Sequence, residues 1–155
     1  MREGAAVCIV FYSRKVLLMR RKIRDGDPWS GDMSFPGGFM RDGEDAITCA
    51  LREFQEETGS EASYLNLLKV LDYFNTLRDN GPKVYPVLCT AKSKFEINPG
   101  DEMEYGGWYP IDNGIVINDP HRGKCLKFND DIVWGLTFRI LDYLMNNEEF
   151  LSKSK

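Results

Sequence analysis

The sequence contains a single histidine, His121, and its four cysteines are spread along the chain without a Cys-x-x-Cys pair. A zinc site usually needs several such ligands at short spacing, so we do not expect one. Hydrolysis by a Ser–His or Cys–His pair would depend on His121 alone, which speaks against that class of catalysis. Cys8, Cys49 and Cys89 lie among apolar or small residues, and we expect them to be buried free thiols.

The sequence also lacks a long apolar run and an excess of positive charge. No stretch approaches the ~18 consecutive apolar residues of a membrane helix, and residues 1–4 hold no apolar signal region. The formal net charge is −4, which argues against a nucleic-acid polymer as partner. We therefore expect a cytoplasmic protein that binds neither a membrane nor a nucleic-acid polymer.

The composition that remains is that of an ordinary globular protein. The chain has 155 residues, of which 43% are hydrophobic and 28% charged, and this length suffices for one domain with a real core. No repeat or linker interrupts it. We expect a single domain over residues 1–150 and a short disordered tail over residues 151–155.

The stretch from Gly38 to Ser60 carries most of the chemical information. Glycine and proline are absent between residues 45 and 58, so we expect a helix there, and Gly59 stands where a left-handed closing residue is favoured. At 3.6 residues per turn, Ile47, Leu51 and Phe54 fall on one stripe, which predicts the face that packs on the core.

A second stripe of this helix carries three glutamates at i, i+3 and i+4, preceded by three small residues that let a ligand approach the backbone. Its members are Glu53, Glu56, Glu57, Ala46, Cys49 and Ala50. Carboxylates at this spacing repel one another, and a hard cation such as Mg²⁺ with substrate phosphate relieves the repulsion. The alternative is a solvated acidic face.

This segment resembles the Nudix box, whose pattern is Gly, five residues, Glu, seven residues, Arg-Glu, apolar, any, Glu-Glu, any, Gly, apolar. The matching residues are Gly38, Glu44, Arg52, Glu53, Phe54, Glu56, Glu57 and Gly59. Ser60 departs from the pattern, because an apolar residue is usual at that position. The resemblance implies a Nudix-type α/β/α sandwich with a mixed β-sheet between helices.

The resemblance also implies hydrolysis of a diphosphate bond with Mg²⁺ or Mn²⁺ as cofactor. The expected metal ligands are Glu53, Glu56 and Glu57. Gly38 and Glu44 are further candidates, and Glu44 alternatively supports the ligands from behind. Arg52 neighbours Glu56 at i+4, so we expect it to orient the carboxylates.

The general base has three candidates, because the family uses either a box glutamate or one from a late loop. These are Glu53, Glu102 and Glu104. Glu102 and Glu104 are two residues apart and share a face in an extended chain. The alternative for this pair is a solvated acidic turn ahead of Trp108.

Several residues near the box are candidates for substrate binding. Arg21 matches the spacing of a basic residue that faces substrate phosphate in the family, with a surface strand end as the alternative. Gly37 and Gly38 let backbone amides approach an anion. Trp29, in the loop before the box, stacks on a flat group or folds back on the core. Arg24 is a further cation for an extra phosphate.

The substrate expected from the resemblance is a nucleoside diphosphate derivative. Residues 31–38, with a Gly-x-x-x-Phe-Pro-Gly-Gly pattern, and residues 133–137 resemble the coenzyme A pyrophosphatase branch, which indicates coenzyme A or an acyl derivative. A nucleoside triphosphate, ADP-ribose or a nucleotide sugar is the alternative substrate, and a non-catalytic nucleotide-binding module is the alternative function. A homodimer is a further expectation, because many family members dimerise.

The rest of the chain predicts a strand-rich fold. We expect strands at residues 5–12, 16–20, 65–74 and 83–90, and another led by Trp108, with turns at residues 13–15 and at Asn80-Gly81. Residues 112–127 read as loop and short strand. Residues 130–146 predict a closing helix that covers the sheet.

Overall fold

The structure is a computed structural model that describes residues 4–26, 31–76 and 81–148. Three of the predictions, on Trp29, Asn80 and the tail at residues 151–155, lie outside these ranges. The elements in chain order are β1 (Gly4–Tyr12), β2 (Lys15–Arg21), β3 (Met33–Ser34), β4 (Gly37–Phe39), α1 (Ala46–Thr58), η1 (Ala62–Tyr64), β5 (Leu65–Val70), β6 (Phe74–Asn75), β7 (Lys83–Ala91), β8 (Met103–Pro110), η2 (Ile111–Asn113), β9 (Ile115–Asp119), β10 (Gly123–Phe128), β11 (Asp131–Val133) and α2 (Gly135–Asn147).

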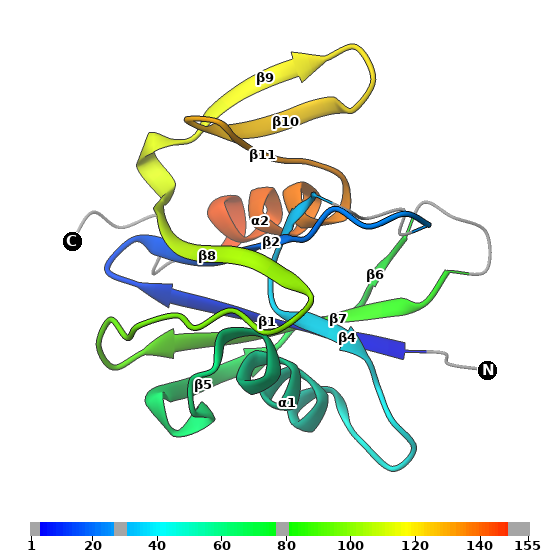
Figure 1. The fold of residues 1–155 in the computed structure, drawn as a ribbon, viewed down its shortest axis with the longest axis vertical. Coiled ribbons are helices and arrows are strands. Elements are labelled where there is room, and N and C mark those ends of the chain that lie inside the picture. Colours follow the sequence, from blue (N-terminus) through cyan, green and yellow to red (C-terminus); the bar gives the residue numbers. More distant parts are fainter. Residues whose placement is uncertain (1–3, 27–30, 77–80, 149–155) are drawn as a thin grey trace.

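A mixed sheet forms the centre of the fold, with α1 and α2 on its two faces (Figure 1). Its path runs β3-β2-β1-β7-β5, while β4 pairs with β1, β6 with β7 and β8 with β2. β1 and β7 are parallel, and the other pairs are antiparallel. This arrangement confirms the expected α/β/α sandwich. Neither α-helix in the described ranges is long and apolar enough to cross a membrane.

Side chains of β1 alternate between the two faces of the sheet and so divide the core in two. Ala6, Cys8 and Val10 pack in the cluster that contains α1, whereas Ile9 and Phe11 pack in the cluster that contains α2. This period of two is the one expected of a strand covered on both faces. The prediction that Cys8, Cys49 and Cys89 are buried free thiols is confirmed, and Cys125 is free and buried as well.

The β1–β2 hairpin turns at Ser13 and Arg14, as predicted. Both residues have positive φ, 47° and 60°, the conformation of a two-residue hairpin turn that follows the strand twist. The Arg14 guanidinium donates to both carboxylate oxygens of Asp112 at 2.9 and 2.7 Å. This contact fixes the hairpin end against η2, just beyond β8.

Helix α1 confirms the predicted span, and Gly59 is its C-terminal cap as expected. The Asp45 carboxylate accepts a hydrogen bond from the Thr48 amide at 2.8 Å, which satisfies an amide in the first turn. Gly59 closes the helix in the left-handed region with φ 73°.

The buried face of α1 is rotated from the predicted one. Cys49, Ala50 and Phe54 are fully buried against the sheet, whereas Ile47 and Leu51 are only partly buried at its margin. The expectation that Cys49 and Ala50 leave room for a ligand was therefore wrong. Their small side chains instead let the helix axis lie close to the sheet.

The second half of the chain differs most from the expectations. The strand predicted over residues 65–74 divides into β5 and β6. β9, β10 and β11 form a separate sheet of order β11-β10-β9, seen at the top of Figure 1. β9 and most of β10 lie in residues 112–127, which were expected to be loop and short strand, whereas β11 lies in the span predicted as the closing helix. The closing helix begins at Gly135 rather than residue 130, because residues 131–133 pair with β10 as a strand.

Candidate active site

Two glycines bring β4 very close to its neighbours. A Cβ atom on Gly38 would lie 2.1 Å from Oε2 of Glu53, and one on Gly37 would lie 2.5 Å from the Ala6 carbonyl oxygen. Any larger residue at these positions would push the strand away from α1 or β1. The Gly37 amide lies 3.3 Å from Oε2 of Glu57 and donates to it, so this amide contacts a carboxylate of the protein itself.

Glu57 is a buried carboxyl with an incomplete set of partners. It is 6% exposed, and its Oε1 atom is buried without a hydrogen-bond partner. Desolvation by burial, together with the nearby charge of Glu53, raises the pKa of Glu57 to about 9. Burial is also the largest cause of the raised pKa of Glu53. An uncompensated oxygen of this kind in a carboxylate pair marks a place where a cation would be favourable.

Arg52 holds the other carboxylates of the box. Its Nε and Nη2 atoms donate to the two oxygens of Glu44 at 2.7 and 2.9 Å, a bidentate geometry. Its Nη1 atom lies 3.2 Å from Glu56 and 3.3 Å from Glu53. The hydrogen bond from Arg52 and one from the Arg41 amide lower the pKa of Glu44 to about 2. The predicted contact between Arg52 and Glu56 is therefore present, and Glu44 joins it.

The connection from β7 to β8 clasps the C-terminal end of α1. The Asn98 amide donates to the Thr58 carbonyl at 2.7 Å, and the Gly100 amide donates to the Glu57 carbonyl at 3.0 Å. A Cβ atom on Gly100 would lie 2.4 Å from the Glu56 carbonyl oxygen. These contacts set where Glu102, two residues further on, stands relative to the glutamates of α1.

Glu102 and Glu104 contact different arginines at the end of β2. Glu102 lies 3.6 Å from Arg21, and the charge of Arg21 acts on Glu57 by lowering its pKa. Glu104 lies 3.0 Å from Nε of Arg20, and Arg20 also lies 4.0 Å from Asp131. The ladder between β2 and β8 shifts register between Arg20 and Arg21, which separates the two ion pairs. Glu102 is thus the late-loop glutamate linked to the α1 carboxylates.

The candidate site residues fall into one connected group and one outlying member. Arg24 donates to the Asp101 carbonyl at 2.9 Å, so it lies beside the loop that carries Glu102. Glu104 is the outlying member, because it contacts Arg20, which also lies 4.0 Å from Asp131 of β11. Sequence reasoning did not single out Asp131, which accepts hydrogen bonds from Tyr105 and Tyr109. Asp131 lies in β11, which was predicted to be part of the closing helix.

The present side-chain positions do not form a complete metal site. Within residues 4–26, 31–76 and 81–148, no three His, Cys, Asp or Glu side chains are grouped closely enough to hold an ion. Glu56 is turned towards Arg52 and is also 3.8 Å from Arg41. The carboxylate chemistry and the unpartnered Oε1 of Glu57 nevertheless fit a divalent cation.

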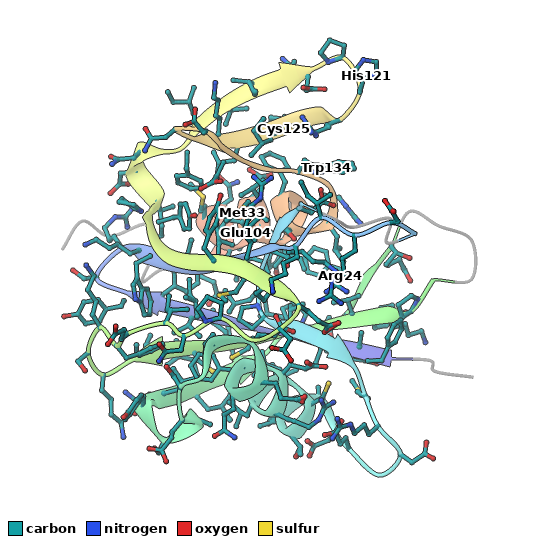
Figure 2. All side chains as sticks on the ribbon, viewed as in Figure 1. Arg24, Met33, Glu104, His121, Cys125 and Trp134 are labelled. Atoms are coloured by element: carbon teal, nitrogen blue, oxygen red, sulfur yellow. The ribbon has the colours of Figure 1, made fainter. Side chains whose placement is uncertain are left out.

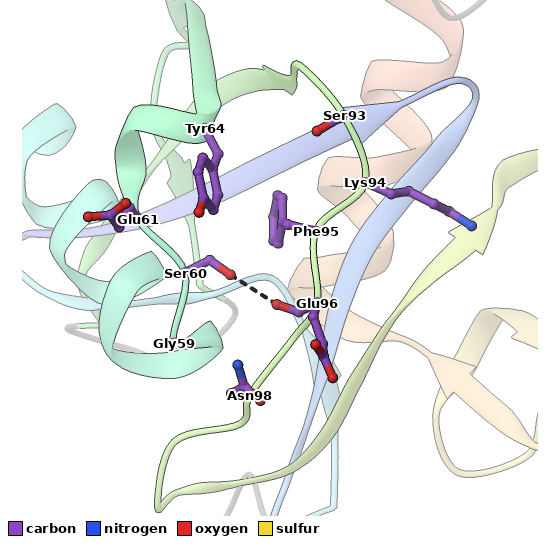
Figure 3. A pocket seen from close by; sticks show the side chains of 9 residues that line it. All are labelled: Gly59, Ser60, Glu61, Tyr64, Ser93, Lys94, Phe95, Glu96 and Asn98. Carbon is purple, nitrogen blue, oxygen red and sulfur yellow. Dashed lines mark hydrogen bonds between the residues drawn. The ribbon is translucent and has the colours of Figure 1, made fainter.

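A cavity of about 610 Å³ lies just beyond the C-terminal end of α1 and is shown in Figure 3. Its lining residues are Gly59, Ser60, Glu61, Tyr64, Ser93, Lys94, Phe95, Glu96 and Asn98. None of these is among the predicted site residues. The rings of Tyr64 and Phe95 already contact each other with centroids 5.9 Å apart. The carboxylate group on α1, and not this cavity, is therefore the candidate active site.

Comparison with known proteins places this geometry in a family. The model of the NUDIX domain matches residues 1–125. An uncharacterized Nudix hydrolase NudL from Pectobacterium atrosepticum is 28% identical over 152 residues, which cover 89% of this chain and 78% of the relative. An ADP-ribose pyrophosphatase from Methanocaldococcus jannaschii is 30% identical over 106 residues, which cover 68% of this chain and 60% of the relative.

Solved structures share the fold. A NUDIX hydrolase from Nitrosomonas europaea superposes with a TM-score of 0.70 at 19% sequence identity, covering 96% of this chain and 73% of that one. The matched domain includes the whole box, with the glutamates of α1, the glycines of β4 and Arg52 in contact as described above. From the family model and these likenesses together, the chain belongs to the Nudix hydrolases.

Proposed function

We propose that this protein hydrolyses the diphosphate bond of a nucleoside diphosphate derivative with the help of Mg²⁺ or Mn²⁺. The observation that carries the proposal is the buried Glu57 carboxyl, whose Oε1 atom has no partner and whose neighbour is a second carboxyl, Glu53. Such a pair is costly without a cation. A bound divalent cation would supply the missing positive charge, and it would also offset the negative charge of the diphosphate.

The residues that would hold the metal are Glu53, Glu56 and Glu57, together with the carbonyl of Gly38. When bound, a divalent ion neutralises charge on the diphosphate and lowers the pKa of the attacking water. Glu56 would have to leave Arg52 to take part, and the exposed guanidinium of Arg41 already lies 3.8 Å from it. We assign Glu44 to positioning, because both of its oxygens accept hydrogen bonds from Arg52.

Glu102 is the base that the geometry supports best. The support for this assignment is that Glu102 lies 3.6 Å from Arg21, whose charge acts on the Glu57 carboxyl, and that it follows the residues of the β7–β8 connection that are hydrogen-bonded to α1. A base must stand within hydrogen-bond reach of the water that it deprotonates, directly or through another water. Glu104 instead forms an ion pair with Arg20, which also lies near Asp131 of the second sheet. Glu53 is already proposed as a metal ligand.

Arg21 and Arg24 are the proposed cations for the substrate phosphates. Both side chains lie beside the loop of Glu102, and a guanidinium matches the geometry of a phosphate. ADP-ribose is the first compound to test, since the M. jannaschii relative is an ADP-ribose pyrophosphatase. Coenzyme A is the second, because residues 31–38 and 133–137 carry the pattern described above.

A side-by-side assay tests the proposal. Purified protein with Mg²⁺ or Mn²⁺ should turn over at least one nucleoside diphosphate derivative, with products that show cleavage between the two phosphorus atoms. ADP-ribose, coenzyme A, dephospho-coenzyme A and nucleoside triphosphates form the panel, and the compound with the highest kcat/KM identifies the substrate class. Tight binding of a nucleotide with no turnover on the whole panel would instead support a non-catalytic binding module.

A further inference from the structure

Trp134 is a large aromatic side chain that belongs to neither hydrophobic core. It stands between β11 and α2, and neither core cluster of the described residues includes it. Its neighbours Val133 and Phe138 are core residues. A half-buried indole outside both clusters is unusual, since tryptophan stabilises a fold mainly through the large apolar area that it buries.

Polar contacts hold the Trp134 ring in place. Its Nε1 atom donates to Oδ1 of Asp32 at 3.1 Å, and the guanidinium of Arg122 lies 5.9 Å from the ring centroid. Arg122 is in turn 3.5 Å from Asp119 across the β9–β10 turn. The indole is therefore held by Asp32, next to β3, and by Arg122, in the β9–β10 turn, at the position labelled in Figure 2.

A short chain of contacts links Trp134 to the proposed diphosphate site. The Asp32 carbonyl accepts a hydrogen bond from the Arg21 amide at 3.0 Å. Arg21 is 3.6 Å from Glu102, and its charge acts on Glu57. Asp32 and Arg21 thus connect the indole to the loop that carries Glu102. A ligand whose phosphates contact Arg21 can place a flat group on Trp134.

Trp108 shows what a structural tryptophan looks like in the same protein. Its ring packs against the core cluster that contains α1, with the rings of Tyr12 and Phe95 at centroid distances of 6.1 and 5.2 Å. The Trp108 indole thus contacts aromatic rings, whereas the Trp134 indole contacts a carboxylate and a guanidinium. An indole beside a guanidinium is suited to stack an electron-rich heterocycle.

We infer that Trp134 and Arg122 form the subsite that binds the base of the substrate. The inference rests on the proposed function, because it assigns to the second sheet the selection of a nucleoside over other diphosphate compounds. The base stacks on the indole while its phosphates contact Arg21. The subsite lies partly beyond residue 125, where the match to the family model ends.

Binding of AMP and of ribose 5-phosphate tests the subsite without turnover. The two compounds share the sugar and the phosphate, and only AMP has a base. Wild-type protein should bind AMP more tightly, and Trp134→Leu should lower the AMP affinity by about 5- to 150-fold, the range of a lost base–aromatic stack. The affinity for ribose 5-phosphate should stay within about twofold. Arg122→Gln should weaken AMP binding, whereas its matched control Lys124→Gln should not.

Tryptophan fluorescence gives a second readout, for which the variant Trp134→Phe keeps an aromatic ring at position 134 but removes the indole. AMP should quench the emission of the wild-type protein, and Trp134→Phe should lose most of the quench while calorimetry still detects AMP binding. The matched comparison is Trp29→Phe, because Trp29 is the competing stacking candidate. Circular dichroism of each variant reports whether it has folded.

Three results would overturn the inference. They are equal affinity of the wild-type protein for AMP and ribose 5-phosphate, unchanged AMP affinity in Trp134→Leu, and loss of the quench in Trp29→Phe instead of Trp134→Phe. Absence of turnover with retained, Trp134-dependent AMP binding would refute the hydrolase proposal and leave the base subsite standing. Turnover without dependence on Trp134 would do the reverse.

Discussion

The carboxylates of the box divide into a paired half and an unpaired half. Glu44 and Glu56 contact Arg52, and the pKa of Glu44 is lowered to about 2 by that contact. Glu57 is buried one residue beyond Glu56 and has a pKa raised to about 9 by burial and by Glu53. Adjacent residues of one helix thus have different surroundings, because Glu56 contacts Arg52 whereas Glu57 is buried against β4 of the sheet. The carboxylates near Arg52 thus have positive charge beside them within the protein, whereas Oε1 of Glu57 has no hydrogen-bond partner.

The largest expected effect is loss of turnover when either half loses a metal ligand. Glu57→Gln and Glu56→Gln should each lower kcat/KM by about 10³-fold, since the metal contributes several kcal/mol to the transition state. Steady-state kinetics at limiting Mg²⁺ measures this, with thermal unfolding as the check on the fold. Near-wild-type turnover in Glu56→Gln would show that the arginine-paired half takes no part in metal binding.

A smaller effect is expected at the base. Glu102→Gln should lower kcat by about 10²-fold, at the lower end of general base contributions, and leave Mn²⁺ affinity nearly unchanged. Glu104→Gln is its matched control, because this residue contacts Arg20 on the same strand end, and its kcat should stay within about threefold. Kinetics and Mn²⁺ titration of both variants decide between them. The opposite ranking would move the base to Glu104, and no effect in either would move it to Glu53.

Positioning by Glu44 should matter less than the ligands themselves. Glu44→Gln removes the charge that anchors Arg52, and we expect a loss of about 10- to 100-fold in activity or metal affinity, the range for groups that orient ligands. Glu61→Gln, on an exposed glutamate beyond the other end of α1, is the control and should behave as wild type. Mn²⁺ titration of both variants measures the effect. A loss of 10³-fold or more would mean that Glu44 is itself a ligand.

The smallest expected effect is a pH dependence of stability in the metal-free protein. The pKa of Glu57 is about 9 in the folded state and starts from an ordinary value of 4.5. Between these values the folded state holds a proton that the unfolded state has released, so the free energy of unfolding falls as pH rises. We expect a decrease on the order of 1 kcal/mol for each pH unit within this window. Urea unfolding in EDTA at several pH values measures it, and an equal slope in Glu57→Gln would exclude Glu57 as its source.

The parts of the fold that the sequence predicts are those whose signals are local. Asp45 and Gly59 mark the two ends of α1 within the helix itself, and the spacing of Arg52 and Glu56 predicts their contact. The bond between Arg52 and Glu44 was not foreseen, because it depends on the path of the loop between β4 and α1. The pairing of Glu102 with Arg21 likewise depends on the register of β2 and β8, which no local pattern encodes.

The second sheet escaped prediction for a similar reason. Ile115 and Val116 are consecutive and both exposed, so β9 shows no alternation that would identify a strand. Residues 131–133 continue the apolar pattern of α2, and Gly135, with φ 60°, is where the chain turns from strand to helix. The predicted core face of α1 was rotated from the observed one because the prediction gave most weight to the large apolar side chains. In the structure the small residues Cys49 and Ala50 are the ones fully buried.

The clasp between the β7–β8 connection and α1 determines where this protein tolerates change in length. Residues 92–94 are exposed, so an insertion there would extend into solvent and leave the clasp intact. An insertion between Asn98 and Glu102 would detach the Gly100 amide from the Glu57 carbonyl and carry the proposed base away from the helix. Gly100 has no side chain to offer a substrate, yet alanine at this position would collide with the Glu56 carbonyl. Natural variation in loop length should therefore concentrate before Asn98 and stop there.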